Sequence, residues 1–365
     1  MSEHATNADR GQRAEAGQRA ERGQRAERGQ RAEDAVGAPL LSVRDLRVAL
    51  PGGAHAVRGV SFDLHAGETL GVVGESGCGK SLTMLSVMRL LPPGAEIAGG
   101  EVRLDGRTEL AGAPETALRR IRGDRLAMIY QDPMTSLNPL MRIGEQIAEG
   151  LRAHGWSRRA ARERAVEGLG EVGIPEPGRA ARAYPHEFSG GMRQRAVIAA
   201  ALVLDPDVLI ADEPTTALDP TIQQQVVNLV RRLQRDRGMA VVWVTHDLGI
   251  VARVAERTLV MYAGGVVEGG PTRELFRQPH HPYTHGLLGA LPRPTGDRER
   301  GPLAQVAGAP PQPGALPVGC LFHPRCPQAI DRCRHDPPEL TDRGHAVRAA
   351  CWVPPDQWAF REGAP

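Results

Sequence analysis

The stretch Gly74-Glu75-Ser76-Gly77-Cys78-Gly79-Lys80-Ser81 satisfies the phosphate-loop pattern G-x-x-x-x-G-K-[ST] in full. An apolar stretch over residues 68–73 precedes it and is typical of a short strand. A helical pattern follows over residues 82–91 and ends at Pro92-Pro93-Gly94. The sequence therefore predicts the strand, loop and helix that the motif requires, and the loop is expected to bind a nucleoside triphosphate.

The residue types of this loop suit phosphate chemistry. Glycines let backbone N–H groups close around phosphate oxygens, and the start of the helix adds a partial positive charge. Lys80 is the only lysine in the chain, and its compact ammonium group can reach the β and γ phosphates as a point charge. The residues expected to hold the triphosphate are Gly74, Ser76, Gly77, Gly79, Lys80 and Ser81, and the Ser81 hydroxyl can also bind magnesium.

Length and charge exclude some classes of protein. With 365 residues the chain has room for about two domains. Its net charge of +2 creates no strong field toward nucleic acid, so no nucleic-acid partner is expected. The longest apolar run, residues 196–204, is too short to span a bilayer, and no signal peptide is recognisable. We therefore expect a cytosolic protein or one attached to a membrane through a partner.

The N-terminal residues form a low-complexity repeat. Between residues 11 and 34 the sequence Gly-Gln-Arg-Ala-Glu recurs with a period of about six, and it offers no face that could form a core. Arginines and acidic residues balance over residues 1–37, which argues against a nucleic-acid or membrane arm. Residues 1–37 are predicted to be a disordered, solvated tail.

Several further segments surround the phosphate loop. Alternating residues over 41–48 and 57–64, with a turn at Pro51-Gly52-Gly53, predict an antiparallel β unit ahead of the loop. Residues 100–106 and 125–130 are two more candidate strands. A helical, arginine-rich pattern then predicts an inserted helical subdomain over about residues 133–190.

Two later strands deliver polar side chains. The apolar strand 207–211 ends in Asp212-Glu213, where one carboxylate can support magnesium and its neighbour can polarise the attacking water. Asp219-Pro220 then begins a helix, with an Asp cap and Pro at the first position. The strand 239–245 is followed by His246.

The ordered set of these motifs resembles that of ABC-transporter ATPase subunits over roughly residues 40–270. The finer similarity is to oligopeptide/dipeptide importer ATPases, through residues 131–139, Phe188-Ser189-Gly190-Gly191-Met192 and His281-Pro282-Tyr283. The resemblance implies an α/β fold with an ABC-type P-loop NTPase core of parallel sheet and helices. It divides the chain into a nucleotide-binding domain over 38–272, with antiparallel β and helical subdomains, and a small Cys-rich extension over 273–365.

The resemblance also implies roles for single residues. It assigns Lys80 to the phosphates, Glu213 to general-base catalysis and His246 to the γ-phosphate. Magnesium would be bound by Ser81, Gln131 and Asp212, and Gln131 would also link the nucleotide state to a membrane partner.

Two further elements complete the implied ATP site. Ser189, Gly190 and Gly191 would contact the ATP of a second subunit. The superfamily usually places a base-stacking aromatic residue before the phosphate loop, and within residues 50–58 the only ring is that of His55.

The implied function is ATP hydrolysis that powers a membrane ABC importer for dipeptides or oligopeptides. The partners would be a second, identical or homologous ATPase subunit, integral membrane permeases and an extracytoplasmic solute-binding protein, with this chain peripheral on the cytoplasmic face. One alternative is an importer of nickel or another small solute. Another is a soluble ABC ATPase that acts on DNA or ribosomes, although such proteins generally carry paired cassettes or long coiled coils.

Four of the five cysteines cluster in the C-terminal extension, with the spacing C-x5-C-x6-C-x17-C: Cys320, Cys326, Cys333 and Cys351. A cytosolic compartment disfavours disulfides, and no C-x2-4-C knuckle typical of zinc sites is present. Zinc and reduced thiols without a metal remain alternatives. The resemblance to the peptide-importer ATPases implies a [4Fe-4S] cluster on these cysteines.

Overall fold

The computed structural model describes residues 37–131, 136–216, 218–291 and 306–358. The predicted disordered tail, residues 1–37, lies outside these ranges except for its last residue. So do residues 132–135 of the predicted helical insertion, and residues 292–305 and 359–365 of the predicted extension.

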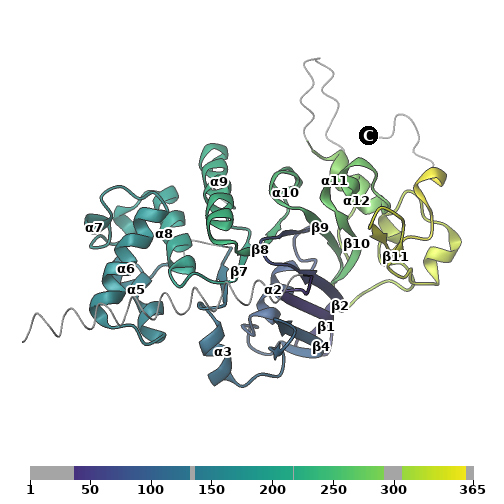
Figure 1. The fold of residues 1–365 in the computed structure, drawn as a ribbon. Coiled ribbons are helices and arrows are strands. Elements are labelled where there is room, and N and C mark those ends of the chain that lie inside the picture. The colour runs from purple at the N-terminus through teal and green to yellow at the C-terminus, as the bar shows by residue number, and fades with distance from the viewer. Residues whose placement is uncertain (1–36, 132–135, 217, 292–305, 359–365) are drawn as a thin grey trace, which may run out of the picture.

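A central sheet with the strand order β11-β12-β10-β9-β3-β8-β7-β6 forms the middle of the molecule (Figure 1). Strands β9, β3, β8, β7 and β6 pair in parallel, whereas β10 pairs antiparallel to β9. Almost every residue of the five parallel strands is buried, as expected where helices cover both faces of a sheet. Their bounds are β3 Thr69–Val73, β6 Leu126–Ile129, β7 Val208–Asp212, β8 Ala240–Thr245 and β9 Arg257–Tyr262, followed by β10 Gly265–Pro271.

A second, four-stranded antiparallel sheet has the order β2-β1-β4-β5, which confirms the predicted antiparallel unit. Its strands are β1 Leu41–Ala49, β2 His55–Leu64, β4 Glu96–Leu104 and β5 Thr108–Glu109. Strand β4 begins at Glu96 rather than at residue 100, because its first residues pair with the end of β1.

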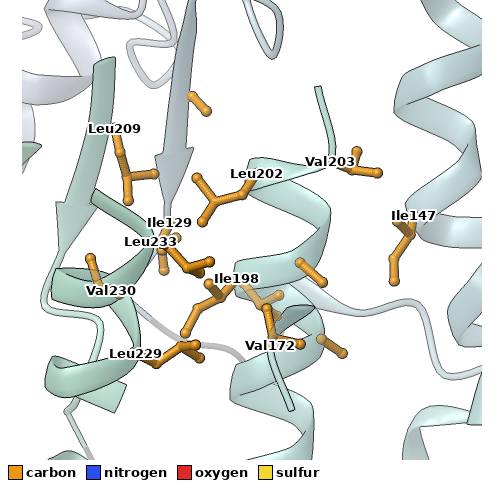
Figure 2. Packing of buried hydrophobic residues seen from close by; sticks show 14 of the residues in the cluster. Ile129, Ile147, Val172, Ile198, Leu202, Val203, Leu209, Leu229, Val230 and Leu233 are labelled. Atoms are coloured by element: carbon orange, nitrogen blue, oxygen red, sulfur yellow. The ribbon is translucent and has the colours of Figure 1, made fainter. Parts of the chain in front are cut away.

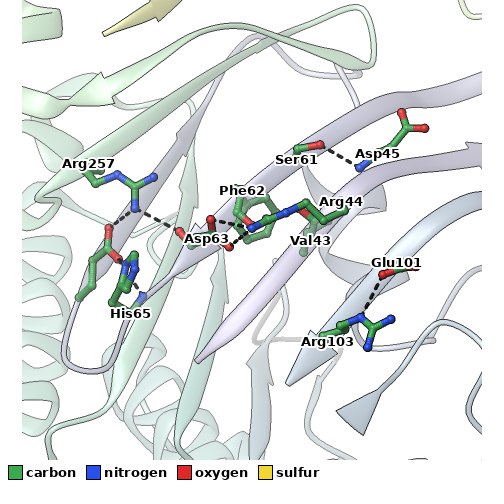
Figure 3. A network of polar contacts seen from close by, with 11 residues as sticks. Val43, Arg44, Asp45, Ser61, Phe62, Asp63, His65, Glu101, Arg103 and Arg257 are labelled. Carbon is green, nitrogen blue, oxygen red and sulfur yellow. Dashed lines mark hydrogen bonds and ion pairs between the residues drawn. The ribbon is translucent and has the colours of Figure 1, made fainter. Parts of the chain in front are cut away.

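A polar network joins the two sheets (Figure 3). Arg257 of β9 donates to the backbone carbonyl of Asp63 in β2 at 3.1 Å and to the Glu68 carboxylate at 2.9 Å. Arg44 of β1 forms a two-pronged ion pair with the Asp63 carboxylate at 2.7 and 2.8 Å. The antiparallel sheet is thereby held beside the strand that carries the phosphate loop.

Helices surround the sheets and form a separate lobe at one end of the molecule, where α5, α6, α7 and α8 lie together (Figure 1). The helix after the phosphate loop, α2, ends earlier than predicted, because Arg89 adopts a left-handed backbone conformation with φ 54°. The helices are α2 Lys80–Val87, α3 Glu115–Ile121, α5 Ile143–Ala153, α6 Arg158–Glu171, α7 Pro177–Ala180, α8 Gly190–Leu202, α9 Pro220–Arg237, α10 Leu248–Val254, α11 Thr272–Arg277 and α12 Pro282–Gly289.

The helical lobe shares one hydrophobic core with the central sheet (Figure 2). Ile198 and Leu202 of α8 lie against Leu209 of β7 and Leu233 of α9, all at most 5% exposed. Helix α9 begins as predicted, since the Asp219 side chain accepts hydrogen bonds from the N–H groups of residues 221 and 222. The lobe that begins with α5 is therefore anchored to the strand that ends in Asp212.

The C-terminal residues extend the central sheet. The two-residue strands β11 (Thr341–Asp342) and β12 (Arg348–Ala349) add to the edge of β10. Rings of Tyr262, Tyr283 and Phe322 pack together, with centroids 4.8 to 5.4 Å apart. Strands this short produce no periodic signal, so the sequence did not reveal that they join the core sheet.

Candidate functional site

The phosphate loop leaves the end of β3 and opens α2, and its glycines are required by close contacts. A Cβ on Gly74, at φ +154°, would lie 2.3 Å from the carbonyl oxygen of Met261. A Cβ on Gly79, at φ +98°, would lie 2.8 Å from the carbonyl oxygen of Ala56. Only glycine allows the chain to turn tightly enough here for successive N–H groups to line an anion site.

Lys80 and Ser81 begin the helix directly after the loop. The Lys80 ammonium group is buried and donates to the carbonyl oxygens of Gly74 at 2.7 Å and Glu75 at 3.0 Å. The Ser81 hydroxyl lies 3.0 Å from the Asp212 carboxylate at the end of β7. Hydroxyl and carboxylate oxygens are ligands that Mg²⁺ prefers, so this pair fits a magnesium ion at the helix start.

The adjacent carboxylates Asp212 and Glu213 differ in their environment. Burial raises the pKa of Asp212, and the negative charge of Glu213 adds to this effect, although the Ser81 hydroxyl opposes it. Burial alone would also raise the pKa of Glu213, but hydrogen bonds from Thr216 and His246 lower it below its usual value. Glu213 is therefore kept in the ionised form that a general base needs.

Glu213 is held in place by several groups. Its own N–H donates to the carbonyl oxygen of Val244 at 2.9 Å, and its backbone adopts φ 47°. Its carboxylate accepts from the Thr216 hydroxyl at 2.8 Å and from the Gln131 amide at 3.3 Å, and it lies 3.3 Å from His246 Nδ1. The structure therefore brings Gln131 and His246 to the carboxylate that the sequence singled out.

Two further predicted site elements are exposed and do not contact Glu213. His55 is exposed at the start of β2, beside Ala56, whose carbonyl oxygen approaches Gly79 of the phosphate loop. Ser189 is exposed at the N-terminus of α8 and accepts a hydrogen bond from the N–H of Met192 at 3.3 Å. Figure 1 places α8 in the helical lobe, whereas α2 lies against the sheets.

Sequence reasoning missed several residues that support the site. Gln194 is fully buried in α8 and donates to the carbonyl oxygen of Pro214, which connects the helix after Ser189 to the loop after Glu213. Its burial could not be read from the sequence, because Gln194 stands between Arg193 and Arg195. Thr216 lies only three residues after Glu213, so this contact is local, whereas Tyr283 meets Glu75 across 208 positions and only the fold brings them together.

The four C-terminal cysteines are free thiols, and Cys320 and Cys326 pack against the hydrophobic cluster that contains Phe322. Burial, with a smaller effect of neighbouring thiols, raises the pKa of Cys326 to about 12 and that of Cys351 to about 11. The backbone N–H of Cys320 donates to the carbonyl oxygen of Cys333 at 2.8 Å. Nevertheless, the described residues contain no group of three or more His, Cys, Asp or Glu arranged to hold a metal ion, so the predicted metal site is not supported by the structure.

Known families match two segments of the chain. The family model described as ABC transporter matches residues 57–216, and that described as the C-terminal region of oligopeptide/dipeptide transporters matches residues 267–333. The dipeptide transport ATP-binding protein DppD of Bacillus subtilis is 48% identical over 319 residues, covering 86% of this chain and 94% of the relative. The oligopeptide transport ATP-binding protein OppD of Salmonella typhimurium is 49% identical over 322 residues, covering 87% of this chain and 95% of the relative.

The chain belongs to the oligopeptide/dipeptide family of ABC-transporter ATP-binding subunits. It is accordingly an ATPase of the ABC type. A solved dimeric ATP-binding cassette in a post-hydrolysis state with ADP and Pi matches this ABC subunit with a TM-score of 0.57 and 28% identity, covering 64% of this chain and 99% of the cassette. Among the helices that the structure describes, none is both long and apolar enough to cross a membrane.

We predict that Glu213→Gln in this ABC ATPase preserves ATP binding and lowers the turnover rate about a hundredfold or more, because it keeps the shape of the side chain and removes the base. Nucleotide titration and phosphate release measure the two effects separately. Lys80→Ala should instead weaken binding itself. Glu149→Gln, on the exposed face of α5, is the matched control and should change neither quantity. Near-normal hydrolysis by Glu213→Gln would refute the assignment.

Proposed function

We propose that this ABC subunit hydrolyses ATP to power the import of dipeptides or oligopeptides through separate membrane permeases. The observation that carries the proposal is the gathering of Gln131, Asp212, Glu213 and His246 beside the phosphate loop, in a chain whose relatives are named dipeptide and oligopeptide transport ATP-binding proteins. The second family match, over residues 267–333, supports the peptide branch against a soluble ABC ATPase that acts on DNA or ribosomes. The same relatives support peptide import over the alternative of nickel or another small solute.

Each site residue then has a defined task. Gly74, Ser76, Gly77 and Gly79 direct backbone groups of the loop toward the phosphates, and Lys80 contributes the positive charge. Ser81 and Asp212, with Gln131, would hold Mg²⁺, which supplies charge neutralisation between the β and γ phosphates. Glu213 accepts a proton from the attacking water, while His246 orients the reacting groups from the neighbouring strand.

The active unit is proposed to be a head-to-tail pair of ATPase subunits. Ser189 and Gly190 are exposed at a helix N-terminus in the helical lobe, and a helix start of this kind attracts phosphate. One chain carries one phosphate loop, and a similar cassette is described as dimeric. Each Ser189-Gly190-Gly191 element would therefore contact the ATP of the partner, with His55 beside the nucleotide of its own subunit.

The permeases are proposed to hold the ATPase at the cytoplasmic face of the membrane, together with an extracytoplasmic solute-binding protein. Leu140 is 85% exposed in the segment that follows Gln131, the highest fraction among the exposed large apolar side chains of the described residues. A permease that covers Leu140 would contact the segment that begins at Gln131. The Gln131 amide in turn donates to the carboxylate of the catalytic Glu213.

The domain division is likewise proposed from the family matches. The nucleotide-binding domain would cover residues 38–272, with the helical subdomain at about 133–190, and the extension would cover residues 273–365.

In that extension we propose a [4Fe-4S] cluster on Cys320, Cys326, Cys333 and Cys351. Cys326 and Cys351 lie close enough to the neighbouring thiols for these to add to the rise in their pKa, yet the described residues do not form a single-ion site. A four-iron cluster binds one thiolate at each iron, so its ligands stand farther apart than those of one zinc ion.

Capture from detergent-solubilised membranes tests the functional proposal. The tagged chain is expected to bring down integral membrane permeases, and Leu140→Asp should lose them without changing the ATPase rate of the isolated chain. Val318→Asp is the matched control, because Val318 is also an exposed apolar residue, at 73%, but lies in the extension. Recovery of ribosomes or DNA in place of permeases would contradict the proposal.

The proposed subunit pair predicts that Ser189→Arg abolishes turnover without lowering the ATP affinity of the isolated chain, because the bulky cation blocks the partner's nucleotide. Ser157→Arg is the matched control: Ser157 is an exposed serine that caps α6 in the same way. Light scattering during the assay reports the assembly state. Full activity of a strictly monomeric sample would overturn the head-to-tail arrangement.

The cluster proposal predicts that anaerobically purified protein is brown and holds about four irons per chain. Cys326→Ser should lose the colour and the iron while ATP binding at Lys80 is retained. Iron analysis, absorption spectroscopy and nucleotide titration measure these effects. A colourless sample with one zinc, or with no metal, would refute the cluster.

A further inference from the structure

An arginine of the C-terminal extension contacts the phosphate loop directly. The Arg325 guanidinium forms a two-pronged ion pair with the Glu75 carboxylate, with N–O distances of 2.6 and 2.8 Å. Its side chain is only 5% exposed, and that of Glu75 is 27% exposed. Paired, charge-assisted hydrogen bonds of this geometry are among the strongest polar contacts in proteins. The contact joins two residues that stand 250 positions apart in the chain.

Arg325 is itself held in one position by its surroundings. Its remaining N–H groups donate to the carbonyl oxygens of Ala307 at 2.7 Å and Val306 at 3.0 Å. The guanidinium also lies 5.7 Å from the centre of the Tyr262 ring and 5.9 Å from that of Phe322. The cation is therefore presented to Glu75 by a prearranged set of groups.

A second residue of the C-terminal region holds the backbone of the same loop position. The N–H of Glu75 donates to the hydroxyl of Tyr283 in α12 at 2.8 Å, and Tyr283 is fully buried. On its other side, the carbonyl oxygen of Glu75 accepts from the Lys80 ammonium group at 3.0 Å. Three side chains thus hold Glu75, and two of them come from the C-terminal region.

The negative charge of Glu75 affects the binding of a triphosphate to this loop. A carboxylate within a loop that receives a triphosphate repels the ligand unless a cation neutralises it. Lys80 is the only lysine of the chain and is needed for the phosphates, whereas Arg325 is paired with Glu75. Arg325 can therefore cancel the charge of Glu75 without taking the lysine from the nucleotide.

We propose that Arg325 is a positioning residue for ATP binding, which neutralises Glu75 and fixes the phosphate loop, and that ATP binding is thereby coupled to the ordering of residues 319–335. The proposal rests on the ATP site described above and deepens it. Coupling between two sites is reciprocal, so whatever orders this cysteine-bearing segment also strengthens ATP binding. The extension acts on the nucleotide through Arg325 and Tyr283, at a place remote from the hydrolysing carboxylates.

Titration of the full-length chain with Mg-ATP tests the electrostatic part. Arg325→Ala should weaken ATP binding about tenfold, which is within the usual range of such couplings. Arg325→Gln combined with Glu75→Gln should restore the affinity to within about threefold of the parent, because the unpaired charge is gone and the side chains can still hydrogen-bond. A merely structural role of Arg325 would show no such rescue. Unchanged affinity in Arg325→Ala, or an unrescued double variant, would overturn the proposal.

Arg332→Ala is the matched control, since Arg332 lies in the same extension over the Trp352 ring and pairs with Asp336 away from the phosphate loop. It should leave ATP affinity unchanged. An equal loss in this variant would show that general loosening of the extension causes the effect, which contradicts the specific role of Arg325.

Hydrogen–deuterium exchange tests the reciprocal part on the unmodified protein. ATP should slow amide exchange in residues 319–335 of the parent chain and should not do so in Arg325→Ala at saturating nucleotide. Unchanged exchange in the parent on ATP binding would refute the coupling. If the parent chain failed to bind ATP at all, the proposed function would fail instead, and Lys80→Ala provides that reference.

Discussion

The parallel pairing of β3 with β8, and of β8 with β7, is the constraint on which the site depends. The carboxyl ends of parallel strands reach the same edge of a sheet, so the phosphate loop, Asp212 and His246 arrive side by side although long segments separate them in the chain. Glu213 follows β7 in a left-handed backbone conformation with φ 47°, which costs energy for a non-glycine residue. The hydrogen bond from its N–H to the carbonyl oxygen of Val244 in β8 offsets part of that cost. The sheet thus determines both the place and the direction of the proposed base.

The two adjacent carboxylates at this edge have pKa shifts in opposite directions. Asp212 is buried beside a hydroxyl and has a raised pKa, so a cation at Ser81 would stabilise its ionised form. Hydrogen bonds from Thr216 and His246 outweigh the effect of burial and lower the pKa of Glu213, so it carries its charge without a metal. Environments that shift the pKa values of two neighbouring acids in opposite directions are typical of sites where the two acids have different roles.

The C-terminal region is built into the nucleotide-binding body. Strand β12 adds to β10, and the rings of Tyr262, Tyr283 and Phe322 form a common cluster between the sheet and the extension. The Arg325–Glu75 ion pair crosses the same boundary. A segment with little apolar periodicity of its own is therefore stabilised by the sheet edge and by the phosphate loop. The cysteine-bearing residues are thereby connected to the phosphate loop through the Arg325–Glu75 contact.

The sequence by itself determined the local chemistry of this ABC ATPase: the phosphate loop, the strand that ends in Asp212-Glu213, the Asp219 cap and the antiparallel β unit all depend on residues close in the chain. It also predicted Gln131 and His246, but only through the ordered set of motifs, because neither residue has a local signature. Only the tertiary structure decided that both lie against Glu213, that Gln194 reaches the carbonyl oxygen of Pro214, and that Arg325 pairs with Glu75. Contacts between distant residues arise from strand order and from packing of the whole core, and no periodicity or spacing in the chain encodes them one by one.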